Sequence, residues 1–345
     1  MARKRSQPFQ LGDIQIAPGT QERVLLPAAR LYSDTPLDLH VEVLHGTKPG
    51  PVLLVCAAIH GDELNGIEIC RRLIQLIDPK ELTGTLLVVP VVNMFGFIQQ
   101  TRYLPDRRDL NRCFPGSERG ALGSRLAFLF RTQLVERATH IIDLHTGAVH
   151  RSNLPQIRVN FDNDEAKSMA AAFNCPVIMN SKDRDGSLRS TASELGIPLI
   201  LYEAGEALRF DYASIKAGVN GVTNVMKMLK MMKGRRTRKK VTPVYSQRSV
   251  WMRSEGDGLV ILKVDLGQQV NRGQLLAHIA PPHGGEHTSV YSSVSGIVIG
   301  ISNIPVSNEG EALFHVACFD ADEIPLATEM VETFVEAYPD RLSDE

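Results

Sequence analysis

The chain has 345 residues, of which 43% are apolar and 22% charged, and its formal net charge is −1. This length predicts about two domains, and the balanced charge gives no reason to expect a nucleic acid or an anionic membrane as partner. Five scattered cysteines without a Cys-x-x-Cys pair indicate reduced thiols. No apolar run approaches the ~20 residues of a membrane span, and the basic N-terminus lacks the apolar segment of a secretory signal. We therefore expect a cytoplasmic protein.

Strands and helices alternate along the first 232 residues. The short tetrapeptide KPGP predicts a turn over 48–51, and residues 93–120 predict a long polar loop, which we expect to be functional because apolar and aromatic residues interrupt its arginines. Apolar periodicity predicts strands over 37–43, 52–59, 85–92, 139–144, 156–161, 176–179 and 198–202, and helices over 67–78, 121–137, 165–173, 187–195 and 212–232. This order is typical of a three-layer α/β domain, whose ligand site lies at the carboxyl ends of strands.

The pattern changes after a basic segment, KGRRTRKK (233–240), which we interpret as a helix end and linker rather than a nucleic-acid contact. From Val241 onward, short apolar stretches separated by glycines indicate a small β barrel or sandwich. We therefore predict an α/β domain over 1–240 and an all-β domain over 241–345.

Two histidines and a glutamate have the pattern of a metal site. His60 follows one predicted strand, Glu63 comes three residues later, and His145 ends another strand. Three protein ligands of this His₂Glu type are typical of catalytic zinc, which keeps a fourth position for water. Asp143, two residues before His145, is a candidate for orienting an imidazole from behind. We expect one Zn²⁺ per chain.

Other charged residues have several possible roles at this stage. Glu203 ends a buried strand, where a carboxylate needs a task or a partner, and a metal hydrolase needs one for acid–base catalysis. The arginines of the long loop (Arg102, Arg107, Arg108 and Arg112) and Arg189 either bind anionic groups or are ordinary surface residues.

Four motifs in order, AAIHGDELNG, TRYLPDRRDLNRCFPG, IIDLHTG and LYEAGE, resemble the succinylglutamate desuccinylase/aspartoacylase family, whose members are related to zinc carboxypeptidases. The resemblance covers about residues 37–232 and implies a carboxypeptidase-like mixed sheet. It implies zinc ligation by His60, Glu63 and His145, and a general base at Glu203. The remaining implied roles are polarisation of the scissile carbonyl by Arg102 and substrate binding by Asn111, Arg112 and Arg189. No residue matches the tyrosine that aspartoacylase contributes from its second domain.

The C-terminal region looks like a lipoyl/biotinyl-type barrel-sandwich. It has no lysine after Lys263 to carry a cofactor, so the resemblance implies a structural or pocket-shielding role. His283 and His287 are expected to be exposed loop residues rather than metal ligands.

We therefore predict a zinc-dependent hydrolase of the amide bond in an N-acyl amino acid or a similar small carboxylate. The alternative with the same machinery is a metallocarboxypeptidase for short or acidic peptides. A catalytically idle binding protein and an RNA-binding protein are further alternatives from other classes. The expected partner is a small molecule, with neither nucleic acid nor membrane, and a homo-oligomer is possible.

Overall fold

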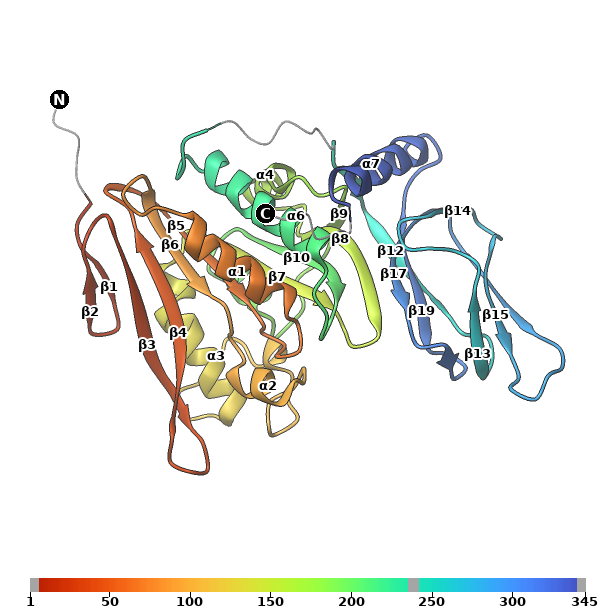
Figure 1. Ribbon diagram of the computed structural model, residues 1–345, viewed down its shortest axis with the longest axis horizontal. Helices are drawn as coiled ribbons and strands as arrows, with labels where there is room; N and C mark the ends of the chain where they lie inside the picture. The colour runs from red at the N-terminus through yellow and green to blue at the C-terminus, as the bar shows by residue number, and fades with distance from the viewer. Residues whose placement is uncertain (1–5, 235–241, 340–345) are drawn as a thin grey trace.

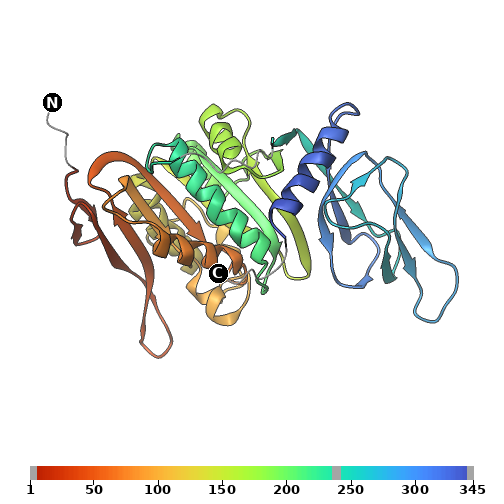
Figure 2. The same ribbon diagram turned by 45° about the horizontal axis from the view of Figure 1, so that its top comes forward.

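A large mixed sheet runs through almost the whole length of the molecule (Figures 1 and 2). The computed structural model describes residues 6–234 and 242–339. The strands of the described residues are β1 (Phe9–Leu11), β2 (Ile14–Ile16), β3 (Thr20–Arg30), β4 (Pro36–His45), β5 (Lys48–Ala57), β6 (Thr83–Val89), β7 (His140–Gly147), β8 (Arg151–Val159), β9 (Val177–Asn180), β10 (Leu199–Glu206), β11 (Val244–Ser246), β12 (Arg248–Arg253), β13 (Gly258–Leu262), β14 (Gln269–Val270), β15 (Leu275–Ala280), β16 (Thr288–Tyr291), β17 (Gly296–Ser302), β18 (Val306–Ser307) and β19 (Ala312–Cys318). The α-helices are α1 (Asn65–Leu76), α2 (Met94–Gln99), α3 (Leu122–Gln133), α4 (Asp164–Phe173), α5 (Leu188–Glu194), α6 (Tyr212–Met228) and α7 (Ile324–Ala337), and the 3₁₀ helices are η1 (Leu110–Arg112) and η2 (Val135–Arg137).

The central strands are parallel and the flanking ones are antiparallel, in the order β12-β19-β17-β8-β10-β7-β5-β6-β4-β3. Strand β5 pairs in parallel with both β6 and β7, and β7 pairs in parallel with β10. The predicted mixed α/β class is confirmed. Strands β13, β15, β16 and β18 form a separate antiparallel sheet, in which β15 lies between β13 and β16.

The C-terminal strands do not stand apart from the main sheet. Strand β17 pairs with β8, and β11 pairs with β9, so strands from both sides of residue 241 share hydrogen bonds. The basic segment falls mostly on residues 235–241, which lie outside the described residues. The division into domains at residue 240 therefore stays a prediction.

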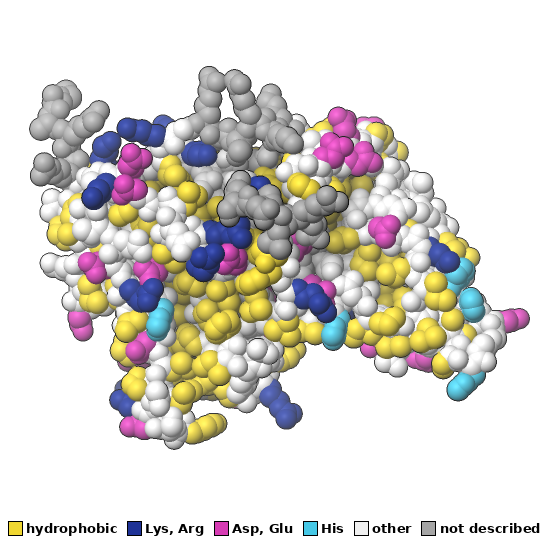
Figure 3. All heavy atoms as spheres, viewed as in Figure 1, with side chains coloured by type: hydrophobic (Ala, Val, Ile, Leu, Met, Phe, Trp, Pro, Cys, Tyr) yellow, Lys and Arg dark blue, Asp and Glu magenta, His cyan; other side chains and the backbone are white. Residues whose placement is uncertain are grey.

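Charged side chains are dispersed over the face seen in Figure 3, with basic, acidic and apolar groups interspersed among the described residues. His283 and His287 are exposed in a loop, as predicted. Within the part of the chain that the structure describes, no helix is long and apolar enough to cross a membrane.

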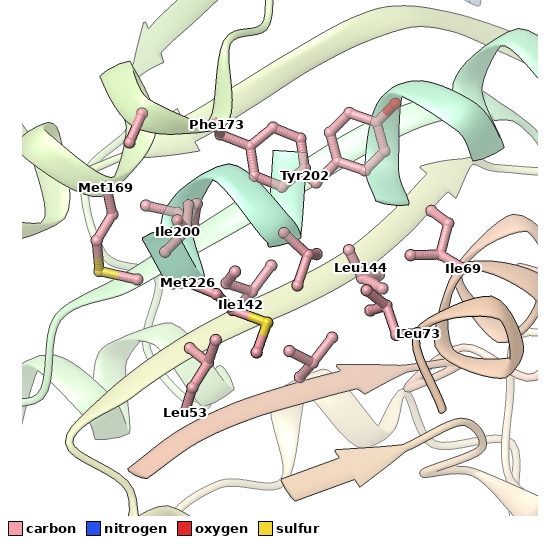
Figure 4. Packing of buried hydrophobic residues seen from close by; sticks show 14 of the residues in the cluster. Leu53, Ile69, Leu73, Ile142, Leu144, Met169, Phe173, Ile200, Tyr202 and Met226 are labelled. Carbon is pink, nitrogen blue, oxygen red and sulfur yellow. The ribbon is translucent and has the colours of Figure 1, made fainter. Parts of the chain in front are cut away.

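Helices cover both faces of the sheet because the strands are apolar on both faces. Leu53, Val55 and Ala57 of β5 face a core formed with α1, α4 and α6. Leu54 and Cys56 between them face a second core, formed with α3 and α5. Figure 4 shows the first core, where Tyr202 of β10 packs beside Phe173 of α4 with ring centroids 4.8 Å apart.

Three predictions of local structure were wrong. Residues 48–51 belong to β5, because Gly50 and Pro51 lie in an irregularity of the β5–β6 pairing rather than in a turn. The loop over 93–120 contains α2 and η1. The C-terminal region is not all-β, since α7 packs on the strands there through Ala327, Val331 and Phe334.

Candidate active site

The loop after β5 places the first two candidate ligands. The backbone of Ala58 has a positive φ of 50°, which turns the chain sharply at the carboxyl end of the strand. Gly61 has no room for a side chain, because a Cβ there would lie 2.0 Å from the backbone carbon of Gly96. This close contact holds the loop against the start of α2, with His60 and Glu63 pointing into the site.

His60, Glu63 and His145 come together as one buried group. The Nδ1 atom of His60 lies 2.7 Å from one Glu63 oxygen, and the Nδ1 atom of His145 lies 2.8 Å from the other. One ligand atom from each residue fits within 4.8 Å of the other two. Two imidazole nitrogens and a carboxylate at this separation suit three ligands of one zinc ion.

Each imidazole is held from behind by an aspartate. The Nε2 atom of His145 lies 2.9 Å from Asp143, the residue that the sequence suggested as an orienting group, and Nε2 of His60 lies 3.1 Å from Asp109. This arrangement leaves both Nδ1 atoms directed at Glu63. Histidines that bind metals usually donate their second ring N–H to a carboxylate, a backbone carbonyl or a water.

The carboxylates favour positive charge at this site. Burial alone would lower the pKa of the His145 imidazole, yet Asp143 and Glu63 raise it well above its ordinary value. Burial would raise the pKa of the Glu63 carboxyl, but His60 and His145 hold it well below its usual range. The same negative charges that favour protons on the imidazoles would favour a divalent cation between them. The residues present therefore fit a zinc ion.

Glu203 lies beside the group formed by His60, Glu63 and His145. The sequence alone did not establish that Glu203 is close to these residues. On the neighbouring parallel strands β10 and β7, Glu203 is directly opposite His145, so the two side chains share a face of the sheet. Its carboxylate accepts a hydrogen bond of 2.8 Å from Asn153 Nδ2 and lies 3.1 Å from Arg158 Nε. A carboxylate held at this edge is placed to exchange protons with a substrate.

Arg102 contacts the same cluster through two carboxylates. Its Nη2 atom donates to Asp109 over 2.9 Å, and its Nη1 atom lies 3.5 Å from Glu63. Asp109 therefore joins Arg102 to His60. The guanidinium is directed into the site by these contacts.

Asn111, Arg112 and Arg189 have groups left over for a ligand. Asn111 accepts a hydrogen bond from the Leu188 amide through its Oδ1 atom, which leaves its Nδ2 group as a donor. Arg112 forms no ion pair with any carboxylate among residues 6–234 and 242–339. Arg189 donates to the Lys182 carbonyl over 2.8 Å and faces Asp183, but its buried Nη1 atom has no hydrogen-bond partner among the residues that the structure describes.

All eight predicted site residues line one pocket of about 260 Å³. The pocket also contains residues that the sequence did not single out, namely Arg151, Asn153, Arg158, Lys182, Arg184 and Trp251. The aspartate of the DLNR motif, Asp109, is a further unpredicted member of the site, through its contacts with His60 and Arg102. The only sequence feature that could have identified Asp109 as a site residue is its position two residues before Asn111.

The fold and this site define a class of hydrolases. The catalytic domain of the succinylglutamate desuccinylase/aspartoacylase family matches residues 49–229, which is more than half of the chain. The chain belongs to this family, whose members are deacylases of N-acyl amino acids.

Relatives among known proteins agree with that assignment. The chain is 26% identical over 241 residues to the N-alpha-acetyl-L-2,4-diaminobutyric acid deacetylase of Halomonas elongata, covering 67% of this chain and 70% of that enzyme. The product-bound structure of the ectoine utilization protein EutE (DoeB) from Ruegeria pomeroyi superimposes with a TM-score of 0.80 at 24% identity, over 92% of this chain and 100% of the other. A succinylglutamate desuccinylase/aspartoacylase structure from Rhodobacter sphaeroides gives 0.78 at 23% identity, over 88% and 98%. These two structural similarities support the fold.

Proposed function

We propose that this protein is a zinc-dependent deacylase that hydrolyses the amide bond of a small N-acyl amino acid. The observation that carries the proposal is the position of Glu203 opposite His145, in the pocket that also contains His60 and Glu63. The Halomonas relative is named for removing an acetyl group from an amino acid, which supports a substrate of this size.

The three candidate ligands, His60, Glu63 and His145, would hold the zinc ion. A zinc ion bound there supplies Lewis acidity and lowers the pKa of a bound water towards ~7. Glu203 takes a proton from the attacking water and returns it to the departing amine. Arg102 donates hydrogen bonds to the carbonyl oxygen as negative charge develops on it.

The substrate carboxylate is bound by side-chain donors that their contacts within the protein leave available. Asn111 offers Nδ2, Arg112 offers its guanidinium, and Arg189 offers its unpartnered Nη1. Burial lowers the pKa of the Arg112 guanidinium, Asp109 opposes this shift, and the nearby Arg184 and Arg102 add to it. An anionic group bound between these cations would relieve their mutual repulsion.

One observation favours the metallocarboxypeptidase alternative. A larger open groove of about 1110 Å³ adjoins the pocket and shares Arg151 and Trp251 with it. A short peptide has space to extend there. Rates that rise with peptide length would favour this alternative over the deacylase.

We also propose a cytoplasmic location, since the five cysteines are free thiols and suit a reducing compartment.

A Glu203→Gln variant tests the proposed mechanism. Amine release is measured from N-acetyl-L-aspartate, N-succinyl-L-glutamate, N-acetyl-L-2,4-diaminobutyrate and short glutamyl peptides. We expect release from at least one acylated amino acid, and a loss of about 10²-fold or more in the variant because proton transfer is removed.

The matched control is Glu206→Gln on the same strand. Glu206 accepts hydrogen bonds from the His150 amide and from Asn303, outside the pocket. The Glu206→Gln variant should release amine at a rate near that of the wild type. Near-normal turnover by Glu203→Gln would contradict the role given to Glu203.

A further inference from the structure

Trp251 is the one tryptophan of the chain, and it belongs to the C-terminal strand β12. It lines both the small pocket of the active site and the larger open groove. An aromatic side chain between these two spaces is in a position to separate them.

A row of paired residues joins Trp251 to the active site across the main sheet. Trp251 is opposite His315 on β19, and His315 is opposite Gly300 on β17. Gly300 is in turn opposite Asn153 on β8, and Asn153 donates to Glu203. Paired residues point to the same face of a sheet, so this row lies on the face that carries Glu203.

Gly300 allows the side chains of Asn153 and His315 to lie close together in this row. A Cβ at this position would lie 2.8 Å from the side-chain oxygen of Asn153 and 3.2 Å from the Cβ of His315. Without a side chain at Gly300, its two neighbours approach each other over the strand.

The indole of Trp251 is held by two neighbouring side chains. Its ring stacks on that of His315, with centroids 4.3 Å apart and planes within 5°. The Arg151 guanidinium lies over the ring at 5.0 Å from its centroid. Burial, with Arg158 and Arg151 nearby, lowers the pKa of His315 to about 3, so a neutral imidazole supports the stack at neutral pH. A side chain held in this way forms a rigid wall.

We propose that Trp251 is the specificity-determining wall at the acyl end of the substrate, where its indole contacts the acyl group and limits its length. This inference rests on the proposed deacylase function. It gives the C-terminal strands a direct part in substrate selection.

The strand order determines which end of the substrate meets Trp251. In the sheet, β5 and β7 with their ligands lie on one side of β10, and β12 lies beyond β8 on the other. Asn111 and Arg112, which would donate to the substrate carboxylate, follow closely after Asp109 in the chain. Because Asp109 contacts His60, both residues lie on the side of β10 that holds the candidate metal ligands. A substrate with its amide at Glu203 and its carboxylate on that side directs its acyl group towards Trp251.

The size of the pocket agrees with a short acyl group. Its volume of about 260 Å³ is below the range of roughly 300–1,000 Å³ that drug-sized ligands occupy. Removing the indole would join the pocket to the groove of about 1110 Å³.

The first test compares wild type, Trp251→Phe and Trp251→Ala on acetyl, butanoyl, hexanoyl and octanoyl derivatives of one accepted amino acid. In Trp251→Ala we expect the octanoyl-to-acetyl ratio of kcat/KM to rise about tenfold or more, as for other pockets that discriminate by size. Trp251→Phe should keep most of the wild-type preference. Leu259→Ala, in the groove but outside the pocket, is the control and should leave the ratio unchanged. Equal changes for all acyl lengths in Trp251→Ala would indicate a merely structural role and overturn the proposal.

The second test uses the emission of Trp251, since no other tryptophan contributes. Zinc-loaded Glu203→Gln protein is titrated with the acetyl and hexanoyl derivatives, and binding is measured in parallel by calorimetry. The indole emission should change with the same saturation curve as the heat. Binding without a change in emission would overturn the proposal.

The two tests separate this inference from the proposed function. An inactive wild type, together with Glu203→Gln emission that still responds to the acyl amino acids, would remove the deacylase function and keep Trp251 as a ligand-contacting wall. Activity with an unchanged acyl preference in Trp251→Ala would keep the function and remove the wall. Silence in both tests would overturn both.

Discussion

Asp109 and Asp143 determine which nitrogen of each imidazole faces the candidate metal position. Each aspartate forms a hydrogen bond with the Nε2 atom of one imidazole, so the Nδ1 atom on the other side of that ring is directed towards Glu63. A carboxylate in this position also makes the imidazole a better electron donor. Both aspartates should therefore contribute to metal affinity without touching the ion.

Replacing either aspartate by asparagine should weaken zinc binding about 10- to 100-fold. The affinity is measured by competition with a chelator of known strength, so that the result does not depend on activity. The exposed Asp162→Asn serves as the matched control and should bind as the wild type. Unchanged affinity in both Asp109→Asn and Asp143→Asn would contradict this role.

The sequence was informative about single residues only where motifs are local. His60 and Glu63 are three residues apart in one short loop, which keeps them close together. Asp143 and His145 are two apart on one strand, so their side chains point to the same face. Trp251 becomes part of the site through four strand pairings between distant segments. No local pattern in the sequence encodes such a neighbour.

At the scale of elements, α1 links the first core to the active site, because it begins just after Glu63 and packs on β5 and β7. Its buried face includes Leu73, which is fully buried, while Leu76 on the same helix is 58% exposed. Helical spacing in the sequence predicted this element correctly.

Leu73→Ala should lower the free energy of unfolding by about 2–5 kcal/mol, because it leaves a cavity between α1 and the sheet. Leu76→Ala is the control on the same helix, and we expect a change of at most about 0.5 kcal/mol. Urea unfolding of both variants measures the difference. Similar losses for the two leucines would contradict the assigned packing of α1.

The elements that the sequence predicted wrongly have identifiable causes. Gly50 and Pro51 are typical of turns, yet pairing with β6 keeps the chain extended there through an irregular register. In α7 the apolar residues Ala327, Met330, Val331 and Phe334 recur at helical spacing. The glycine-separated strands that precede α7 dominate the pattern of the region, so the helical spacing of this last segment does not stand out.

At the scale of the whole molecule, the extended sheet joins the catalytic half to the C-terminal strands. The order of β5, β7 and β10 places three groups of site residues at neighbouring strand ends, as the alternation of strands and helices predicted. The β8–β17 pairing that continues the sheet was not predictable, because it depends on which edge remains open after the first domain has formed.

The central claim is that zinc held by His60, Glu63 and His145 is required for amide hydrolysis. The most direct test is amine release from the best N-acyl amino acid by one preparation, before chelation, after chelation and after zinc is returned, with bound zinc measured at each step. We predict one zinc per chain, loss of release with the metal, and recovery when zinc returns. His145→Ala should neither retain zinc nor recover. Full release from metal-free protein, or normal activity in His145→Ala, would contradict the account.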